Sequence, residues 1–237
     1  MRLDVLAIAA HPDDVEITCG GTIIKLTERG KAVGALDLTA GEMGTMGTAE
    51  ERLREADEAA KILGLAVREN LHLPDSALED SLDHRRRIAA VIRKYKPQTI
   101  ILPLPERQRH PDHRMASILG YGACFLAGLA KAGIDGEPHR PHTIIYASSF
   151  IDVTPSFYVD ISAQFERKKR AVAVYRSQFD GSPQSKMIFK PGNDILELLE
   201  NYHHKYGVDV VCHYAETFWI AEPMLVDDPT QLPVRSI

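Results

Sequence analysis

Strand-like and helix-like segments alternate along the first two thirds of the chain, and this alternation limits the fold more than any other feature. Leu3–Ala9 is apolar on both faces, as the central strand of a parallel sheet is. Repeated strand–helix–strand units predict a Rossmann-like, doubly wound α/β fold, with a mostly parallel sheet and helices on both faces, in a single domain spanning residues 1–237. The expected strands are Leu3–Ala9, Val33–Thr39, Asn70–Leu73, Thr99–Leu104, Thr143–Ser149 and Phe157–Ile161.

Helix signals fill the intervals between these strands. Thr48–Glu51 is a capping box that opens one helix, and Gly64 closes it. Phe179–Asn193 is rich in Gly, Pro and Ser and is expected to be a surface loop. The other expected helices span 17–29, 84–96, 112–131, 163–179 and 193–206.

The composition excludes several classes of protein. With 44% hydrophobic and 26% charged residues, the chain is an ordinary soluble globular protein. The net charge of −5 gives no basis for binding nucleic acid or anionic lipid. We find neither a secretion signal nor an apolar stretch near the ~20 residues that cross a membrane. The three scattered cysteines form no disulfide framework, so we expect a cytoplasmic protein.

Two polar clusters follow expected strands directly. His11-Pro-Asp-Asp-Val-Glu16 follows the first strand, and His110-Pro-Asp-His113 follows the fourth. In the strand order 3-2-1-4 of this fold, the first and fourth strands are neighbours, and ligands bind beyond their carboxyl ends. The two clusters are therefore expected to meet. Taken alone, each segment would also fit a turn or a helix cap.

The residue types in these clusters suit a catalytic metal. Two histidines and one carboxylate, with an open position, are typical ligands of a catalytic zinc ion, and the same set accepts iron, cobalt or nickel. Asp13 and Asp14 should have different roles, because adjacent side chains in an extended or loop backbone point in different directions. One can bind the metal while the other serves as a general base toward the attacking water.

Together, the two clusters resemble the motifs of the LmbE-like, or PIG-L, family of zinc-dependent N-acetylglucosamine deacetylases. The resemblance covers nearly the whole chain. The other matching segments are Asp37–Gly47, Arg52–Gly64, Leu73–Asp75 and Tyr214–Glu216. The resemblance implies His11, Asp14 and His113 as ligands of one Zn²⁺ per chain, and Asp13 as the general base.

The resemblance also implies supporting residues. His110 would be a charged group that stabilises the oxyanion, and Asp112 would orient one of the histidines. Glu16 would support the ligands from behind or cap the next helix. Some relatives carry a tyrosine near the position of Ile195 that leans over the site, and this chain has none there.

The substrate contacts are expected to come from the loops. Arg52 and Asp75 align with substrate-contacting positions of the family, and Arg54 is a rival to Arg52. A guanidinium at Arg52 would suit a carboxylate such as that of malate. Met43 and Met46 could form an apolar wall over the substrate or pack as ordinary loop residues.

Within the family, the chain is most similar to the bacillithiol-biosynthesis branch, which deacetylates N-acetylglucosaminyl malate. Tyr175–Phe179 and the segment around His139–His142 carry this similarity. The expected partner is thus a small-molecule amino-sugar conjugate. A homo-oligomer is expected as well, and Phe218–Ala221 could join its interface or the core.

Three alternatives stay open. One is a broader-range deacetylase of N-acetyl sugars such as chito-oligosaccharides. Another is a phosphoesterase with two metals, which would need more carboxylate ligands. The last is a non-catalytic nucleotide-binding or regulatory module on the same fold. That module would place a glycine-rich phosphate loop after the first strand, where this chain has His11, and Gly20 and Gly21 lie too far into the helix.

Overall fold

The computed structural model describes residues 1–187 and 194–234 and contains one seven-stranded sheet with the strand order β3-β2-β1-β4-β5-β7-β6. Strands β1 to β5 pair in parallel, and β7 pairs antiparallel with both β5 and β6. The strands are β1 (Val5–Ala9), β2 (Val33–Thr39), β3 (Val67–Leu73), β4 (Thr99–Pro103), β5 (Thr143–Ala147), β6 (Phe157–Asp160) and β7 (Ala215–Trp219). The predicted fold class and the order 3-2-1-4 of the first four strands are confirmed.

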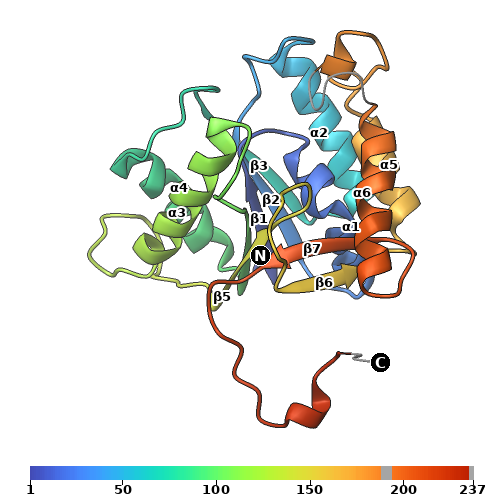
Figure 1. Cartoon of the computed structure of the whole chain (residues 1–237). Coiled ribbons are helices and arrows are strands. Elements are labelled where there is room, and N and C mark those ends of the chain that lie inside the picture. Colours follow the sequence, from blue (N-terminus) through green and yellow to red (C-terminus); the bar gives the residue numbers. More distant parts are fainter. Residues whose placement is uncertain (188–193, 235–237) are drawn as a thin grey trace.

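Helices cover both faces of this sheet (Figure 1). The helices are α1 (Asp14–Glu28), α2 (Ala49–Leu63), α3 (Leu82–Tyr95), α4 (Pro111–Ala127), α5 (Phe165–Ala173) and α6 (Ile195–Asp209), with 3-10 turns at Ser185–Met187 and Pro229–Gln231. Alternate residues of β1 enter two different cores. Leu6 and Ile8 pack with α3 and α4, whereas Val5, Ala7 and Ala9 pack with α1. This alternation is why the strand reads as apolar on both faces.

Local sequence signals predicted several helix ends correctly. Thr48 and Glu51 form the predicted capping box, and Gly64 ends α2 in the left-handed region at φ 77°. Gly30 follows α1 with φ 77°, as expected of a helix-terminating glycine. Residues 188–193 of the expected surface loop lie outside the described residues. Residue 193, the expected start of the last helix, is one of them.

Other expectations were wrong. The first helix begins at Asp14 and not at residue 17, and β3 begins at Val67. Helix α5 ends at Ala173, well before residue 179, and the chain then turns. Strand β7 was not predicted at all, although Phe218 lies in the core with no exposed surface. Ala215–Trp219 has two adjacent polar residues, Glu216 and Thr217, so it is neither a continuous apolar run nor an alternating pattern.

Strand β7 also anchors α1 through a buried carboxylate. Glu216 accepts hydrogen bonds from the backbone N–H groups of Gly21 and Thr22, at 2.8 and 2.7 Å, and pairs with Lys168 at 2.5 Å. These N–H groups lie just after a kink in α1 at Cys19, where φ is −144°. The kink interrupts the regular helix, and Glu216 supplies side-chain acceptors at the start of its second part. The helix that carries Asp14 is thereby attached to the sheet.

The chain after β7 leaves the body of the molecule (Figure 1). Residues 221–234 are exposed throughout, with Leu225 98% accessible. None of the described helices combines the length and the apolar composition that crossing a membrane requires. The three cysteines are free thiols; Cys19 and Cys124 are buried, and Cys212 is half-buried.

Candidate active site

The loops that follow β1 and β4 bring the two polar clusters together. Strands β1 and β4 pair side by side in parallel, so their carboxyl ends lie at one edge of the sheet. The ring centres of His11 and His110 are 4.8 Å apart, and those of His11 and His113 are 5.3 Å apart. One ring nitrogen of each of these histidines lies within 4.8 Å of the others. The clusters thus meet as the strand order indicates.

Asp14 joins two of these histidines. Its Oδ1 lies 3.1 Å from His113 Nε2, and its Oδ2 lies 3.4 Å from His11 Nδ1. Its Oδ2 also accepts a hydrogen bond from the backbone N–H of His11 at 2.9 Å. Because Asp14 is the first residue of α1, the start of that helix sets its place. The structure thus brings the three expected ligands into contact with one another.

Two further carboxylates lie beside the other ring nitrogen of His11. Its Nε2 lies 3.1 Å from Asp75 Oδ1 and 3.7 Å from Asp112 Oδ2. Asp75 accepts from Met43 N–H at 2.9 Å, and Asp112 accepts from Ser76 N–H at 2.7 Å. Carboxylates that hold the outer nitrogen of an imidazole fix its tautomer and raise its basicity. Asp75, expected at the substrate, contacts His11 and also lines the cleft over the histidines.

The electrostatics of this cluster favour a cation. Although burial disfavours a charged imidazole, the carboxylates of Asp112, Asp14 and Asp75 raise the pKa of His11 to about 12. Although burial alone would raise it, His113 and His11 hold the pKa of Asp14 well below its usual range. A buried site that binds a proton this strongly has a net demand for positive charge. Its imidazole and carboxylate donors fit a zinc ion or a similar divalent metal.

Asp13 lies beside this group in a strained conformation. Its φ of 103° places it in the left-handed region, which residues other than glycine occupy at a cost and which recurs at functional sites. Its Oδ2 accepts a hydrogen bond from Arg52 Nη2 at 2.8 Å. Burial raises the pKa of Asp13 and Arg52 lowers it, with a result of about 6. Near neutral pH, such a carboxylate can both accept and return a proton.

Arg52 is committed to protein groups. It is 8% exposed, and its Nε and Nη1 donate to the carbonyls of Pro12 at 3.1 Å and Gly41 at 3.4 Å. A side chain at Gly41, where φ is 68°, would place its Cβ 2.3 Å from Arg52 Nη1. The rival Arg54 is exposed on the other side of α2 and lines a different surface hollow. Arg52 therefore holds Asp13, and it also lines the cleft over the histidines.

A backbone hydrogen bond sets the protonation of one ring nitrogen of His110. Its Nδ1 accepts a hydrogen bond from Asp112 N–H at 3.2 Å, so the ring proton of the neutral form belongs on Nε2. Burial, with the nearby charges of His11 and His113, lowers the pKa of His110. The charged form that the resemblance implied is thus disfavoured here. A neutral imidazole with its proton on Nε2 still donates a hydrogen bond.

Glu16 has a different environment from the one expected. It is fully buried and accepts hydrogen bonds from Arg68 and from the hydroxyl of Tyr175. Arg68 also forms a two-pronged pair with Asp37 at 2.7 and 3.0 Å. Within this ion cluster, the charge of Glu16 is one of the causes that raise the pKa of Asp13.

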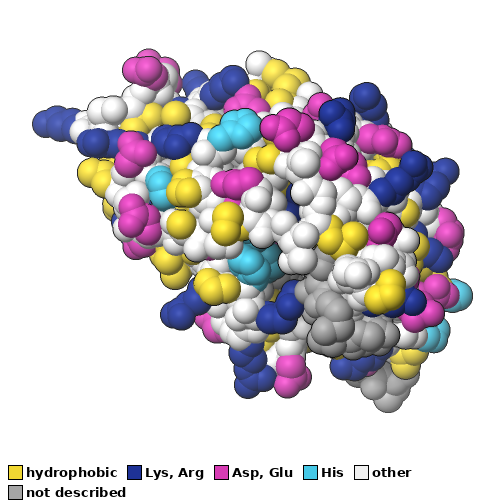
Figure 2. All heavy atoms as spheres, turned by 90° about the horizontal axis from the view of Figure 1, so that it is seen from above, with side chains coloured by type: hydrophobic (Ala, Val, Ile, Leu, Met, Phe, Trp, Pro, Cys, Tyr) yellow, Lys and Arg dark blue, Asp and Glu magenta, His cyan; other side chains and the backbone are white. Residues whose placement is uncertain are grey.

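A cleft of about 310 Å³ opens over the histidines and includes Met43, Arg109, Gln178 and Phe179 in its lining. Met43 is 67% exposed, and its backbone rather than its side chain is bound, to Asp75. The face seen in Figure 2 mixes acidic, basic and apolar side chains, and histidine side chains reach the surface near its centre.

The family model for PIG-L, described as GlcNAc-PI de-N-acetylase, matches residues 6–124. That range contains both histidine clusters and Arg52. The chain belongs to the PIG-L family.

Relatives of known description extend this PIG-L match. The chain is 39% identical to diacetylchitobiose deacetylase from Thermococcus kodakarensis over 214 residues, which cover 84% of this chain and 74% of the relative. It is 33% identical over 234 residues to a probable N-acetyl-alpha-D-glucosaminyl L-malate deacetylase 2 from Bacillus anthracis, covering 91% and 94%. The crystal structure of a conserved protein from Thermus thermophilus superposes with a TM-score of 0.85 at 40% identity, covering 94% and 97%.

Sequence reasoning about this PIG-L protein missed several lining residues. Arg109 precedes the second cluster directly, and Gln178 belongs to the segment Tyr175–Phe179 that carried the resemblance to one branch. Their proximity to motif residues was the available signal. His139 lies elsewhere, because its ring contacts the carbonyl of Pro97 at the amino end of β4. Ile195 is buried in an apolar cluster with Ile17.

Proposed function

We propose that this PIG-L protein hydrolyses the acetamide of an N-acetylglucosaminyl compound and releases acetate and a free amine. One observation carries the proposal. A buried carboxylate held by an arginine, Asp13, lies directly beside a histidine–aspartate group with a strong demand for positive charge. General base and metal ligands must be adjacent but distinct for metal-assisted hydrolysis, and adjacent residues supply both here.

His11, Asp14 and His113 are the residues that would hold a zinc ion. His110 is a further imidazole within reach of the group, and Asp75 and Asp112 fix the orientation of His11. When bound, the ion would polarise the acetamide carbonyl and lower the pKa of a water molecule.

Asp13 would act in two stages. It accepts a proton from the water that attacks the acetyl carbon, and it then returns that proton to the departing nitrogen. Arg52 holds the carboxylate by its 2.8 Å hydrogen bond and keeps it ionised against the effect of burial. His110 donates from Nε2 to the oxygen that becomes negative, since its Nδ1 is occupied by Asp112 N–H.

The aglycone is proposed from two observations. Arg52 was the expected partner of a malate carboxylate, and its three guanidinium nitrogens are bound to Asp13, Pro12 and Gly41. Identity is also higher to the diacetylchitobiose deacetylase, at 39%, than to the malate-conjugate deacetylase, at 33%. We therefore place uncharged N-acetylglucosamine saccharides first and N-acetylglucosaminyl malate second.

Metal removal provides the direct test. Dialysis against a chelator should abolish acetate release from N,N'-diacetylchitobiose, and added Zn²⁺ should restore it, because the ligands persist in the apoprotein. N-acetylglucosamine and N-acetylglucosaminyl malate, assayed in parallel, rank the aglycones. Turnover that survives complete metal removal would refute the proposal, as would the absence of acetate release from all three compounds with Zn²⁺ present.

Arg52 provides a second test through the pH profile. Arg52→Gln should shift the acidic limb of kcat/KM upward by about one to two pH units, because an arginine beside an aspartate lowers its pKa by that amount. Without the charge, Asp13 stays protonated to higher pH and cannot accept a proton. Arg52→Lys keeps the charge and should shift the limb less. If Arg52→Gln lowers kcat/KM at every pH but does not shift the acidic limb, Arg52 has only a structural role.

A further inference from the structure

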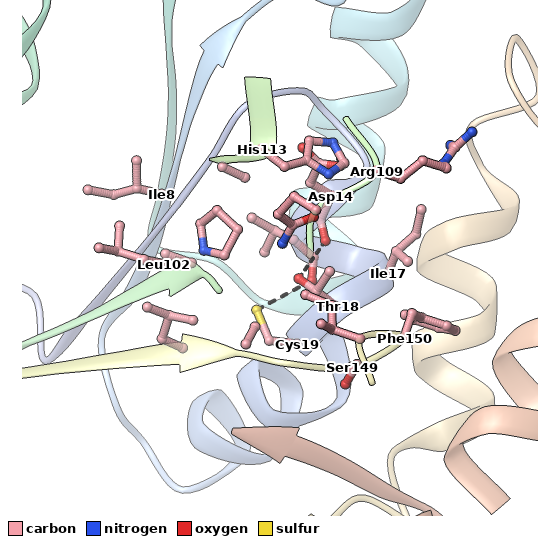
Figure 3. Close-up of a pocket in the computed structure, with 18 of the residues that line it drawn as sticks. Ile8, Asp14, Ile17, Thr18, Cys19, Leu102, Arg109, His113, Ser149 and Phe150 are labelled. Carbon is pink, nitrogen blue, oxygen red and sulfur yellow. Dashed lines mark hydrogen bonds and ion pairs between the residues drawn. The ribbon is translucent and has the colours of Figure 1, made fainter. Parts of the chain in front are cut away.

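Two hollows of opposite character meet at the candidate active site. One is the polar cleft of about 310 Å³ above the histidines. The other is an apolar cavity of about 140 Å³ that runs inward between α1 and the sheet (Figure 3). Four residues line both, namely Asp14, Ile17, Arg109 and His113. The two hollows therefore lie side by side at Asp14 and His113, two of the expected metal ligands.

The walls of the apolar cavity come from the centre of the fold. Ala9 lies on β1, Ile101 on β4 and Ala147 on β5, and Val15 and Cys19 close it from α1. This is the point where the order of parallel strands reverses, at which open α/β sheets bind ligands. A ligand there would lie against aliphatic groups on several sides.

Polar groups inside the cavity are already engaged by the protein. Thr18 Oγ1 donates to the carbonyl of Asp14 at 2.7 Å, and Cys19 Sγ donates to that of Val15 at 3.5 Å (Figure 3). Ser149 Oγ accepts from the backbone N–H of Thr217 at 3.4 Å. An occupant therefore meets mainly hydrocarbon, and burying a polar group there would cost free energy.

The position of Asp13 indicates which part of a substrate enters each hollow. Asp13 and His110 line the polar cleft and not the apolar cavity. The proposed base must reach the departing nitrogen, so the amino sugar lies in the polar cleft. The acyl group is on the other side of the scissile bond and points toward the apolar cavity.

We propose that the apolar cavity is an acyl pocket that accepts linear N-acyl groups longer than acetyl, of about four to six carbons. This inference rests on the proposed amide hydrolysis. A cavity of about 150 Å³ lined by aliphatic side chains holds a benzene molecule, whereas an acetyl group offers a single methyl. Each further methylene buried in this cavity should strengthen binding by roughly fourfold.

A series of N-acyl glucosamines tests the substrate range. N-acetyl, N-butyryl and N-hexanoyl glucosamine are compared by amine release from the zinc-loaded protein. We expect kcat/KM for butyryl to equal or exceed that for acetyl. Cleavage of acetyl with butyryl slower by about tenfold or more would overturn the acyl pocket and leave the proposed function intact. No cleavage of any member would overturn both.

A variant that narrows the cavity tests its location. Ala147→Val adds two methyl groups to its wall and should lower the butyryl-to-acetyl ratio of kcat/KM by about tenfold or more. Ala35→Val on β2 is the matched control, because it adds the same groups to a buried strand position outside the cavity lining. Its ratio should equal that of the wild type. An unchanged ratio in Ala147→Val, with both variants folded, would overturn the assignment.

Discussion

Replacing Asp13 by asparagine is expected to lower kcat by about 10²–10⁴-fold, the usual contribution of a general base. Asparagine is the suitable replacement because it has the same shape and tolerates the positive φ of 103° at this position. Alanine would add backbone strain to the loss of the carboxylate. Turnover is measured by acetate release at saturating substrate and Zn²⁺.

Metal content separates the roles of the two adjacent aspartates. Asp13→Asn should keep about one zinc ion per chain, whereas Asp14→Ala should lose it, since Asp14 contacts both His11 and His113. Metal is quantified after gel filtration, together with the circular dichroism of each variant. Equal metal loss in both would contradict the assignment of Asp13 as the base.

Replacing Glu216 by alanine should lower the free energy of unfolding by about 3–5 kcal/mol, the effect of breaking a buried ion pair. Lys168 and Glu216 are both fully buried, and Lys168 also donates to the carbonyl of Ile17 at 2.8 Å. The variant removes the counter-charge of the ammonium and the carboxylate acceptor of two N–H groups of α1. Urea unfolding gives the change.

The deficit in Glu216→Ala should shrink as pH rises. Burial lowers the pKa of Lys168, and Glu216 opposes this effect. Without Glu216, the folded pKa of Lys168 falls further below its unfolded value of about 10.4. Between the folded pKa of the variant and that of the wild type, only the variant gains stability as pH rises, because its unfolded chain binds more protons than its folded state. Asp152→Asn, at an exposed pair with Arg107, is the control and should leave the unfolding curve unchanged. A Glu216→Ala curve that overlays the wild type at every pH would refute the structural role of this pair.

The start of α1 shows where local sequence rules stop. Periodicity suggested a helix from residue 17, but the helix begins at Asp14 because Asp13 takes a left-handed conformation. Aspartate tolerates a positive φ better than most residues, but nothing in the local sequence assigns this conformation to Asp13 rather than to Asp14. It is stabilised by the bond from Arg52, which lies 39 residues away in the chain. Strained backbone at functional sites is sustained by such distant contacts.

Charged residues were harder to place than apolar ones. Arg52 and Arg54 are two residues apart on α2, and their sequence neighbourhoods are alike. The rotation of the helix buries Arg52 and exposes Arg54. Glu16 and Asp75 likewise have partners, Arg68 and His11, on other elements. The sequence alone could name these residues but could not pair them.

The sequence by itself determined the parallel α/β sheet and the meeting of the two histidine clusters. Apolar runs, caps and strand order are local or topological properties, and the sheet rules turn them into a location for the site. The tertiary structure decided the partner of each buried charge, the strand β7 and the apolar cavity beside His113. Electrostatic and packing energies depend on distances between elements, and only the folded chain sets those distances.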